Sequence, residues 1–499
     1  MAPSHRSLWE TGKSVLLFGL VALSVILTWL SWNYRPPFMA AEKQYTAMPP
    51  LGEEKDLRQI VIPEQLTFHL AGEHGLAWPF TPVYEQTLEQ VFQWPLTDLT
   101  AVPWESVDWL ALRRGTGIEM SYGVPIRMVD LPWLAEGDGG TEVSDDIRVH
   151  RAWMVEDDGV ILYLLDDTGR HAYRGSLAAD REAWNALLQE AASLPKAVFY
   201  PDPPATENAA AAAATADHGR PASRAEGAEA GAAPEGETEA GQAVSADAGA
   251  ARDREPTGWY LPVQAPKVDE EVRRWAPISL SSYTLYLFVD PTHIREIVTR
   301  DGVFVYTDGS RNLQVEPSRL RSIYDVPAVQ PPAGAEKDDI DHVGTAIQFI
   351  NQYGGWMGQY VLDSVRRFTP EHVHLLFRYY HGAYPVYPLA AGGEDARIEF
   401  STPPAGQVMT LERPLYRFGE KLQTTTRVLP DGEAVYRRLL ALAAEGRDIR
   451  QIRLAYQMEV TASEEDSYWF RLVPGWVFIG ADGRLHWLMA EEPKAADDE

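Results

Sequence analysis

Three histidines form the most specific grouping of metal-ligating side chains in the sequence. His372 and His374 would share one face of a strand predicted near residues 373–380, because alternate residues of a strand point to the same side. His381 follows shortly after. Such a pair can begin a zinc site, but the spacing specifies no third ligand. We therefore interpret this stretch as a solvated strand face, and we predict no metal and no cofactor.

An acidic loop is the second candidate for cation binding. Its five carboxylates lie in one Gly-rich stretch, at Glu136, Asp138, Glu142, Asp145 and Asp146. Calcium prefers such oxygen ligands, but the ligand order of an EF-hand loop is absent from the sequence. We therefore favour an acidic surface loop.

Motifs for nucleophilic catalysis are weak. Ser193 and Lys196 match the spacing of a serine–lysine pair, but Pro195 disrupts the helix that would have to carry both side chains on one face. The sequence contains neither G-x-S-x-G nor H-E-x-x-H. We predict no catalytic residue. Carboxylate pairs that meet only in the fold, as glycosidases use, stay open as an alternative.

Composition excludes further classes of function. The chain contains no cysteine, so it has no thiolate nucleophile, disulfide or Cys-ligated metal. Its formal net charge is −28 and it lacks a Lys/Arg-rich run, so we predict no binding of nucleic acid. Its length of 499 residues has room for about three domains.

One segment predicts a membrane span. Residues 14–32 read SVLLFGLVALSVILTWLSW, which is 19 residues without a charge. At about 1.5 Å per residue, such a helix nearly crosses a hydrocarbon core of about 30 Å. The GKS sequence at residues 12–14 resembles the end of a phosphate loop, but Ser7 replaces the first glycine and an apolar helix follows.

A cleaved signal peptide is the alternative interpretation of this segment. Its apolar region should be shorter, and cleavage after Ala40 or Ala41 would put Phe38 or Met39 at the −3 position, where a small residue is required. We therefore predict an uncleaved anchor, with residues 1–13 in the cytoplasm and the bulk of the chain outside it.

The predicted span also offers a candidate surface for helix–helix contact. Gly19 and Ala22 share a helix face and would allow close approach of another helix, and Trp29 follows near one end. The alternative is that these residues simply face lipid.

The remainder predicts an α+β fold of three extracytoplasmic units with antiparallel sheets. A segment rich in Ala, Gly and Glu has too few large apolar side chains to fold, so we expect it to be a disordered insertion. The predicted parts are an N-terminal domain at 45–195, the insertion at 203–256, a middle domain at 257–326, a C-terminal domain at 335–490 and an acidic tail at 491–499.

Periodicity predicts individual elements within these units. The helices are expected at residues 83–92, 183–194, 341–353 and 432–444, with a further helix beginning at Pro291. Hairpins are expected at 149–165 and 303–315, and strands at 373–380, 452–460, 468–473, 476–479 and 485–489.

Several short motifs, in this order and spacing, resemble the YycH family. They are LLFGLV at 16–21, LTWLSW at 27–32, LFVDP at 287–291, VYTDGSR at 305–311, FINQYGGW at 349–356, FRYY at 377–380 and LVPGW at 472–476. Gly475 departs from the alanine that is usual in the last motif, and the Ala/Gly/Glu-rich insertion is not a family feature.

The resemblance implies a non-catalytic, membrane-anchored regulator. Proteins of this family act with a similar partner, YycI, on the sensor histidine kinase WalK, also called YycG, which governs cell-wall homeostasis. The implied contacts involve the transmembrane helices and the extracytoplasmic parts. The alternative is a tethered cell-envelope enzyme or a ligand-binding protein, which an interdomain cleft with buried titratable groups would favour.

Overall fold

The computed structural model describes residues 23–24, 51–135, 147–166, 171–203, 257–288, 290–316, 320–327, 341–369, 372–389, 396–402, 408–462 and 468–489. Residues 1–49 and 50–499 form separate compact units. In the first unit, Leu23 and Ser24 are helical. The rest of the predicted span at 14–32 lies outside the described residues. Among those that are described, no helix is both long and apolar enough to cross a membrane.

A nine-stranded antiparallel sheet organises the first part of the second unit. Its order is β3-β7-β6-β5-β4-β1-β2-β8-β9. The strands are β1 (Gln65–Leu70), β2 (Glu73–Ala77), β3 (Leu96–Pro103), β4 (Thr116–Arg127), β5 (Arg148–Glu156), β6 (Val160–Asp166), β7 (His171–Leu177), β8 (Lys196–Pro201) and β9 (Gly258–Pro262).

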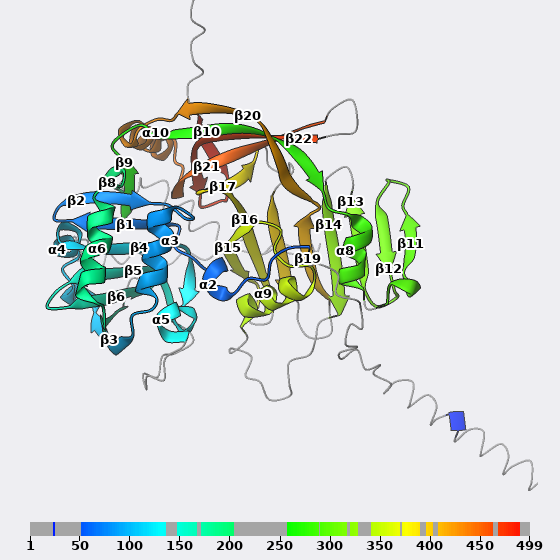
Figure 1. The fold of residues 1–499 in the computed structure, drawn as a ribbon, viewed down its shortest axis with the longest axis horizontal. Coiled ribbons are helices and arrows are strands. Elements are labelled where there is room, and N and C mark those ends of the chain that lie inside the picture. The colour runs from blue at the N-terminus through cyan, green and yellow to red at the C-terminus, as the bar shows by residue number, and fades with distance from the viewer. Residues whose placement is uncertain are drawn as a thin grey trace, which may run out of the picture. The chain divides into compact units, whose positions relative to one another are not determined.

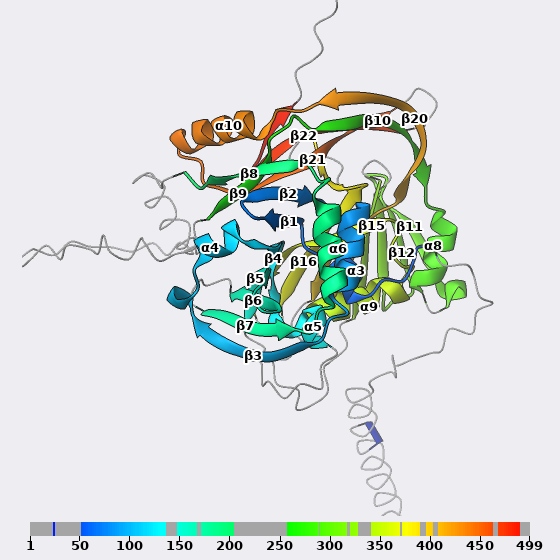
Figure 2. The ribbon, with the colours of Figure 1, turned by 60° about the vertical axis from the view of Figure 1, so that its left-hand side comes forward.

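Helices cover one face of this sheet. The longer two, α3 (Pro82–Val91) and α6 (Arg181–Ala191), lie side by side across it (Figures 1 and 2). Leu66 and Phe68 of β1 join the main apolar core together with Trp184 of α6. The shorter helices are α2 (Leu57–Ile60), α4 (Trp109–Arg114), α5 (Pro132–Ala135), η1 (Trp104–Ser106) and η2 (Met128–Asp130).

The opposite face of the same sheet is partly polar. Because side chains alternate along a strand, the residues between those core positions point away from the helices. They include Thr67 and His69 of β1 and Glu119 of β4, all fully or almost fully buried. This polar face forms one wall of the candidate site described below.

A second, 14-stranded sheet contains the remaining strands. Its main path is β11-β12-β13-β14-β19-β18-β16-β17-β21-β22-β10-β20, with β15 beside β16 and β23 beside β22. The strands are β10 (Lys267–Pro277), β11 (Arg295–Val298), β12 (Phe304–Thr307), β13 (Asn312–Glu316), β14 (Arg321–Pro327), β15 (Gln359–Arg367), β16 (Val373–His381), β17 (Tyr384–Pro388), β18 (Arg397–Thr402), β19 (Val408–Pro414), β20 (Tyr416–Val428), β21 (Ile449–Ala462), β22 (Tyr468–Gly480) and β23 (Leu485–Met489).

Three α-helices pack on this second sheet region. They are α8 (Leu280–Leu287), α9 (His342–Gln352) and α10 (Gly432–Ala444), and a 3-10 turn, η3 (Pro291–His293), follows α8. Val435, Leu439 and Leu442 place one face of α10 against the apolar side chains of β21 and β22. The same helix contacts β8 and β9 of the first sheet, as Figure 2 shows.

The predicted boundary between the middle and C-terminal domains does not coincide with a boundary between sheets. Strands from residues 257–326 and from 335–490 alternate in the 14-stranded sheet, and β9 belongs to the first sheet. The prediction of antiparallel pairing holds for most strands, but β17 and β21 run parallel. Long-range pairing of this kind leaves no local sequence signal.

Two local predictions were wrong. The two strands predicted at 468–473 and 476–479 are one strand, β22, which continues through Pro474. On one edge, β10 pairs with β22 only as far as Leu472, and β23 pairs with β22 from Gly475 onward, so Pro474 falls between these two partner strands. Proline is tolerated where no ladder hydrogen bond is required of it. The helix expected at Pro291 is only a single 3-10 turn.

Candidate functional site

A cleft of about 360 Å³ lies between the two sheets. Its first wall is the polar face of β1, β4 and β5, extended by β9. Its second wall comes from β21, β22 and the turn between β16 and β17. Aromatic side chains line both walls, at Trp78, Tyr122, Trp259, Tyr260, Tyr380 and Trp476. The volume falls within the range of about 300–1,000 Å³ that is usual for small-molecule sites.

A buried ion network joins the two walls at the base of this cleft. Arg453 on β21 forms an ion pair with Glu64, which directly precedes β1. The other side of the same guanidinium binds Asp363 on β15 at 2.8 Å and the Tyr387 hydroxyl at 2.9 Å. Arg378 on β16 then holds Asp363 through two hydrogen bonds of 3.1 Å. The network therefore ties four strands to the entry of the first sheet.

The pKa values of the two carboxyl groups of this network shift in opposite directions. Burial raises the pKa of Glu64, although the charge of Arg453 opposes it. Burial acts in the same direction on Asp363, but two guanidinium groups, those of Arg378 and Arg453, outweigh it and lower the pKa of Asp363. Asp363 is thus the firmly ionised member, and Glu64 is the more easily neutralised link between the sheets.

A histidine cluster lies behind the first wall of the cleft. His69 is fully buried, and its Nε2 lies 3.3 Å from the Glu119 carboxylate. Its Nδ1 lies 3.0 Å from Nδ1 of His74, so one of the two nitrogens donates and the other accepts. The His69 ring stacks on Trp153 with the planes only 6° apart. Arg151 holds the other Glu119 oxygen at 3.2 Å.

Charges in this cluster are set by burial and by these neighbours. Burial, followed by the electrostatic interaction with His69, lowers the pKa of His74 to about 4. Burial alone would raise the pKa of Glu119, but the charge of Arg151 and the His69 contact outweigh it and lower that pKa. Glu119 and Glu64, the two glutamates that line the cleft, are therefore both engaged by cations of the protein.

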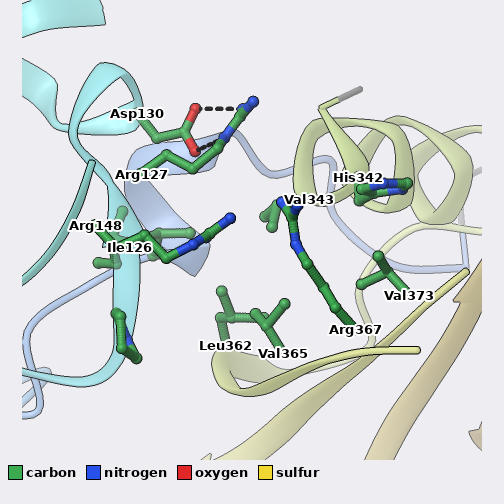
Figure 3. A pocket seen from close by; sticks show the side chains of 12 residues that line it. Ile126, Arg127, Asp130, Arg148, His342, Val343, Leu362, Val365, Arg367 and Val373 are labelled. Carbon is green, nitrogen blue, oxygen red and sulfur yellow. Dashed lines mark hydrogen bonds and ion pairs between the residues drawn. The ribbon is translucent and has the colours of Figure 1, made fainter. Parts of the chain in front are cut away.

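A second, much smaller pocket lies near the start of α9 (Figure 3). Its volume of about 30 Å³ holds roughly one water molecule. Arg148 and Arg367 reach toward each other across it, while Arg127 pairs with Asp130 at 2.7 Å and with Asp341 at 3.0 Å. No organic ligand fits there, so the larger cleft is the candidate site.

The histidines singled out from the sequence do not come together. His374 lies on β16 and pairs with Glu399 at 2.9 Å, whereas His381 pairs with Glu271 at 2.9 Å. His372 precedes the strand, and its ring packs at a tilt against Phe368. Within the described part of the chain, no group of three ligating side chains is placed to hold a metal ion.

The other sequence candidates are also separated or lie elsewhere. The Ser193 hydroxyl donates to the Glu190 carbonyl, while Lys196 lies on β8 and pairs with Glu73. The serine and the lysine therefore share no helix. The acidic loop at 136–146, the helix-contact candidates Gly19, Ala22 and Trp29, the tail at 491–499 and all but Pro203 of the insertion at 203–256 lie outside the described residues.

Sequence reasoning missed the ion network and the histidine cluster. Glu64 and Arg453 are 389 residues apart, and neither belongs to a recognisable motif. One signal was present, because Arg453 stands between Ile452 and Leu454 in an apolar strand. A charged residue in such a strand requires a buried partner. The sequence does not say which partner that is.

Profiles of two domains of one family match this chain. "YycH protein, N-terminal domain" matches residues 10–129, and "YycH protein, C-terminal domain" matches residues 257–491. The chain belongs to the YycH family. The resemblance seen in the sequence is therefore confirmed, and the chain is a regulator-type protein of the YycH kind.

Solved structures agree with this assignment. The crystal structure of YycH from Bacillus subtilis aligns with a TM-score of 0.62 at 15% identity, covering 88% of this chain and 98% of that one. At that identity the likeness shows a YycH fold. An uncharacterized protein from Eubacterium rectale ATCC 33656 aligns at a TM-score of 0.29 and 9% identity, over 44% of this chain and 82% of its own, which supports no argument. Among curated proteins, none matches significantly.

The ion network predicts a large effect of Arg453→Met. The substitution leaves Glu64 and Asp363 buried without their shared cation, so we expect it to lower the free energy of unfolding by about 3–5 kcal/mol. Glu64→Gln should cost less, because Asp363 keeps both of its arginines. Urea unfolding measures both variants. Arg437→Met is the control, since that side chain is 70% exposed on α10. Equal stability of Arg453→Met and the control would contradict this role.

The histidine cluster predicts a pH dependence of stability. The pKa of His74 is about 4 in the folded chain and 6.5 ordinarily, so only the unfolded chain gains this proton as the pH falls from 6.5. The contribution of neutral His74 to the free energy of unfolding is fully present above pH 6.5 and is lost as the pH falls toward 4. His74→Gln should reduce the acid loss by about 1–2 kcal/mol, a value discounted for partial exposure.

Urea unfolding at pH 7 and pH 4.5 tests this dependence. His293→Gln is the matched control, because the His293 side chain is 76% exposed. If His74→Gln loses as much stability between the two pH values as the unaltered chain, His74 does not titrate as stated.

Proposed function

We propose that this protein is a non-catalytic, membrane-anchored regulator of a WalK/YycG-type sensor histidine kinase of cell-wall homeostasis, acting together with a YycI-like partner. In this proposal residues 14–32 cross the membrane once. Residues 1–13 lie in the cytoplasm, and the two-sheet unit lies outside the cell.

The family match is the observation that carries this proposal. The N-terminal profile begins at residue 10, so it includes the apolar segment at 14–32 as well as the first strands of the folded unit. An anchor that belongs to the family's own domain supports a role for the helix beyond attachment.

Two features of the chain support a non-catalytic role. Among the described residues, the fold assembles none of the nucleophile or metal motifs considered in the sequence, and Glu64 and Glu119 of the cleft are each paired with a cation of the protein. A glycosidase would need a carboxyl group free to give a proton to its substrate, whereas Glu64, despite its raised pKa, is held by Arg453. The cleft itself supports the alternative of a ligand-binding protein, which is compatible with regulation.

Replacing residues 14–32 with an unrelated apolar helix of equal length tests the proposed contact. Co-purification with the kinase from membranes should fall by about tenfold, and kinase-dependent transcription should change, if the helix supplies a principal contact. Unchanged co-purification and transcription would contradict that role of the helix.

A matched pair of single substitutions then tests one face of the helix. Ala22→Leu adds bulk beside Gly19, whereas Leu17→Phe adds bulk on nearly the opposite face, given about 100° per residue. We expect only Ala22→Leu to weaken co-purification. A larger effect of Leu17→Phe would assign the contact to the other face.

A further inference from the structure

We infer that the cleft between the two sheets is a binding site for an uncharged sugar of one or two rings. This inference is independent of the kinase and rests on four properties of the cleft: its volume, its aromatic walls, its polar side chains and its balance of charge.

The volume of the cleft sets an upper limit on the size of the ligand. About 360 Å³ accommodates a mono- or disaccharide, but not a folded protein segment or a long chain of sugar rings. The cleft borders solvent, so such a ligand needs no large opening of the protein to enter.

Two tryptophans supply flat apolar surfaces. Trp78 follows β2 and Trp259 lies on β9, and both are half-buried in the lining of the cleft. Indole rings pack well against the C–H faces of pyranose rings, because the ring face is electron-rich and sugar C–H groups are weakly positive. Trp476 of the opposite wall is only 3% exposed and its Nε1 donates to the Pro430 carbonyl at 2.8 Å, so it supports that wall from behind.

Polar side chains between these rings suit hydroxyl groups. Gln65 is held through its contact with Thr67 at 3.1 Å, and Gln451 donates to the Gly123 carbonyl at 2.9 Å. Both amides line the cleft and present donors and acceptors at fixed positions. Sugar hydroxyls both donate and accept, so a wall with both kinds of group recognises them better than a purely acidic or basic one.

The balance of charge favours a neutral ligand. The carboxylates of Glu64 and Glu119 stand against the guanidinium groups of Arg453, Arg151 and Arg450. Ion pairs within the protein join Arg453 to Glu64 and Arg151 to Glu119, so the excess is a single cation, the exposed Arg450. A ligand with several negative charges would also meet the two glutamates, and a strongly cationic one would meet the arginines.

Titration of the full chain, purified in detergent, tests this site. The probes are maltose, cellobiose and N,N′-diacetylchitobiose, followed by tryptophan fluorescence and calorimetry. We expect saturable binding of at least one disaccharide with a dissociation constant between about 10 µM and 1 mM. Absence of saturable binding by all three would overturn the proposal, as would tighter binding of glucose 6-phosphate than of any neutral probe.

Matched tryptophan substitutions locate the binding. Trp259→Ala should weaken the affinity by about tenfold or more, whereas Trp469→Ala, on β22 but outside the cleft lining, should change it by less than about twofold. Equal weakening by both substitutions would overturn the assignment to the cleft.

A rim substitution keeps the test valid if Trp259→Ala fails to fold. Arg450 is exposed at the edge of the cleft, so Arg450→Ala should preserve the fold. We expect it to weaken binding about threefold through the loss of donors to sugar hydroxyls. Unchanged affinity of Arg450→Ala alongside an unfolded Trp259→Ala would count against the cleft as the site.

Discussion

The guanidinium of Arg453 is the group on which the arrangement of the two sheets depends. It binds Glu64 at the entry of the first sheet and Asp363 in the second at the same time. Burying three charges is costly, and a well-packed apolar cluster of the same size would often be as stable. The ion network instead fixes the relative geometry of the sheets, because a planar guanidinium donates hydrogen bonds only in fixed directions.

The cleft follows from that constraint. Its first wall is the polar face that alternation leaves on β1 and β4, and its second wall is the strand that carries Arg453. The main apolar core also continues from the helices of the first sheet to α9 and β16 of the second. Apolar packing and the ion network therefore both hold the two sheets together. A ligand in the cleft would therefore contact two sheets that are already joined, and binding would not have to assemble them.

Local elements could be predicted from the sequence, and long-range pairing could not. The helix predicted at 432–444 is α10 with identical bounds, because apolar periodicity and the N-cap Asp431 are both local. By contrast, β10 pairs with β20 and β22, which lie far along the chain, and nothing in residues 267–277 specifies either partner. The domain boundary was predicted after residue 326 because a Pro-rich segment begins there. However, β14 before this boundary pairs with β19 beyond the boundary.

The candidate site was less predictable than the fold. The histidines chosen for their spacing belong to separate ion pairs, and the residues that do converge, such as Glu64 and His69, carry no motif. Family resemblance, by contrast, was readable from short motifs because their order along the chain survives large changes elsewhere. It identified the class of protein without pointing to the cleft.

Native-state hydrogen exchange under increasing urea tests most directly whether the two sheets form one cooperative body. The most protected amides of β1 and β4 and those of β21 and β22 should converge on one free energy of opening with one urea dependence. If the amides of β1 and β4 open at a clearly lower free energy while β21 and β22 stay protected, the ion network does not join the sheets as described.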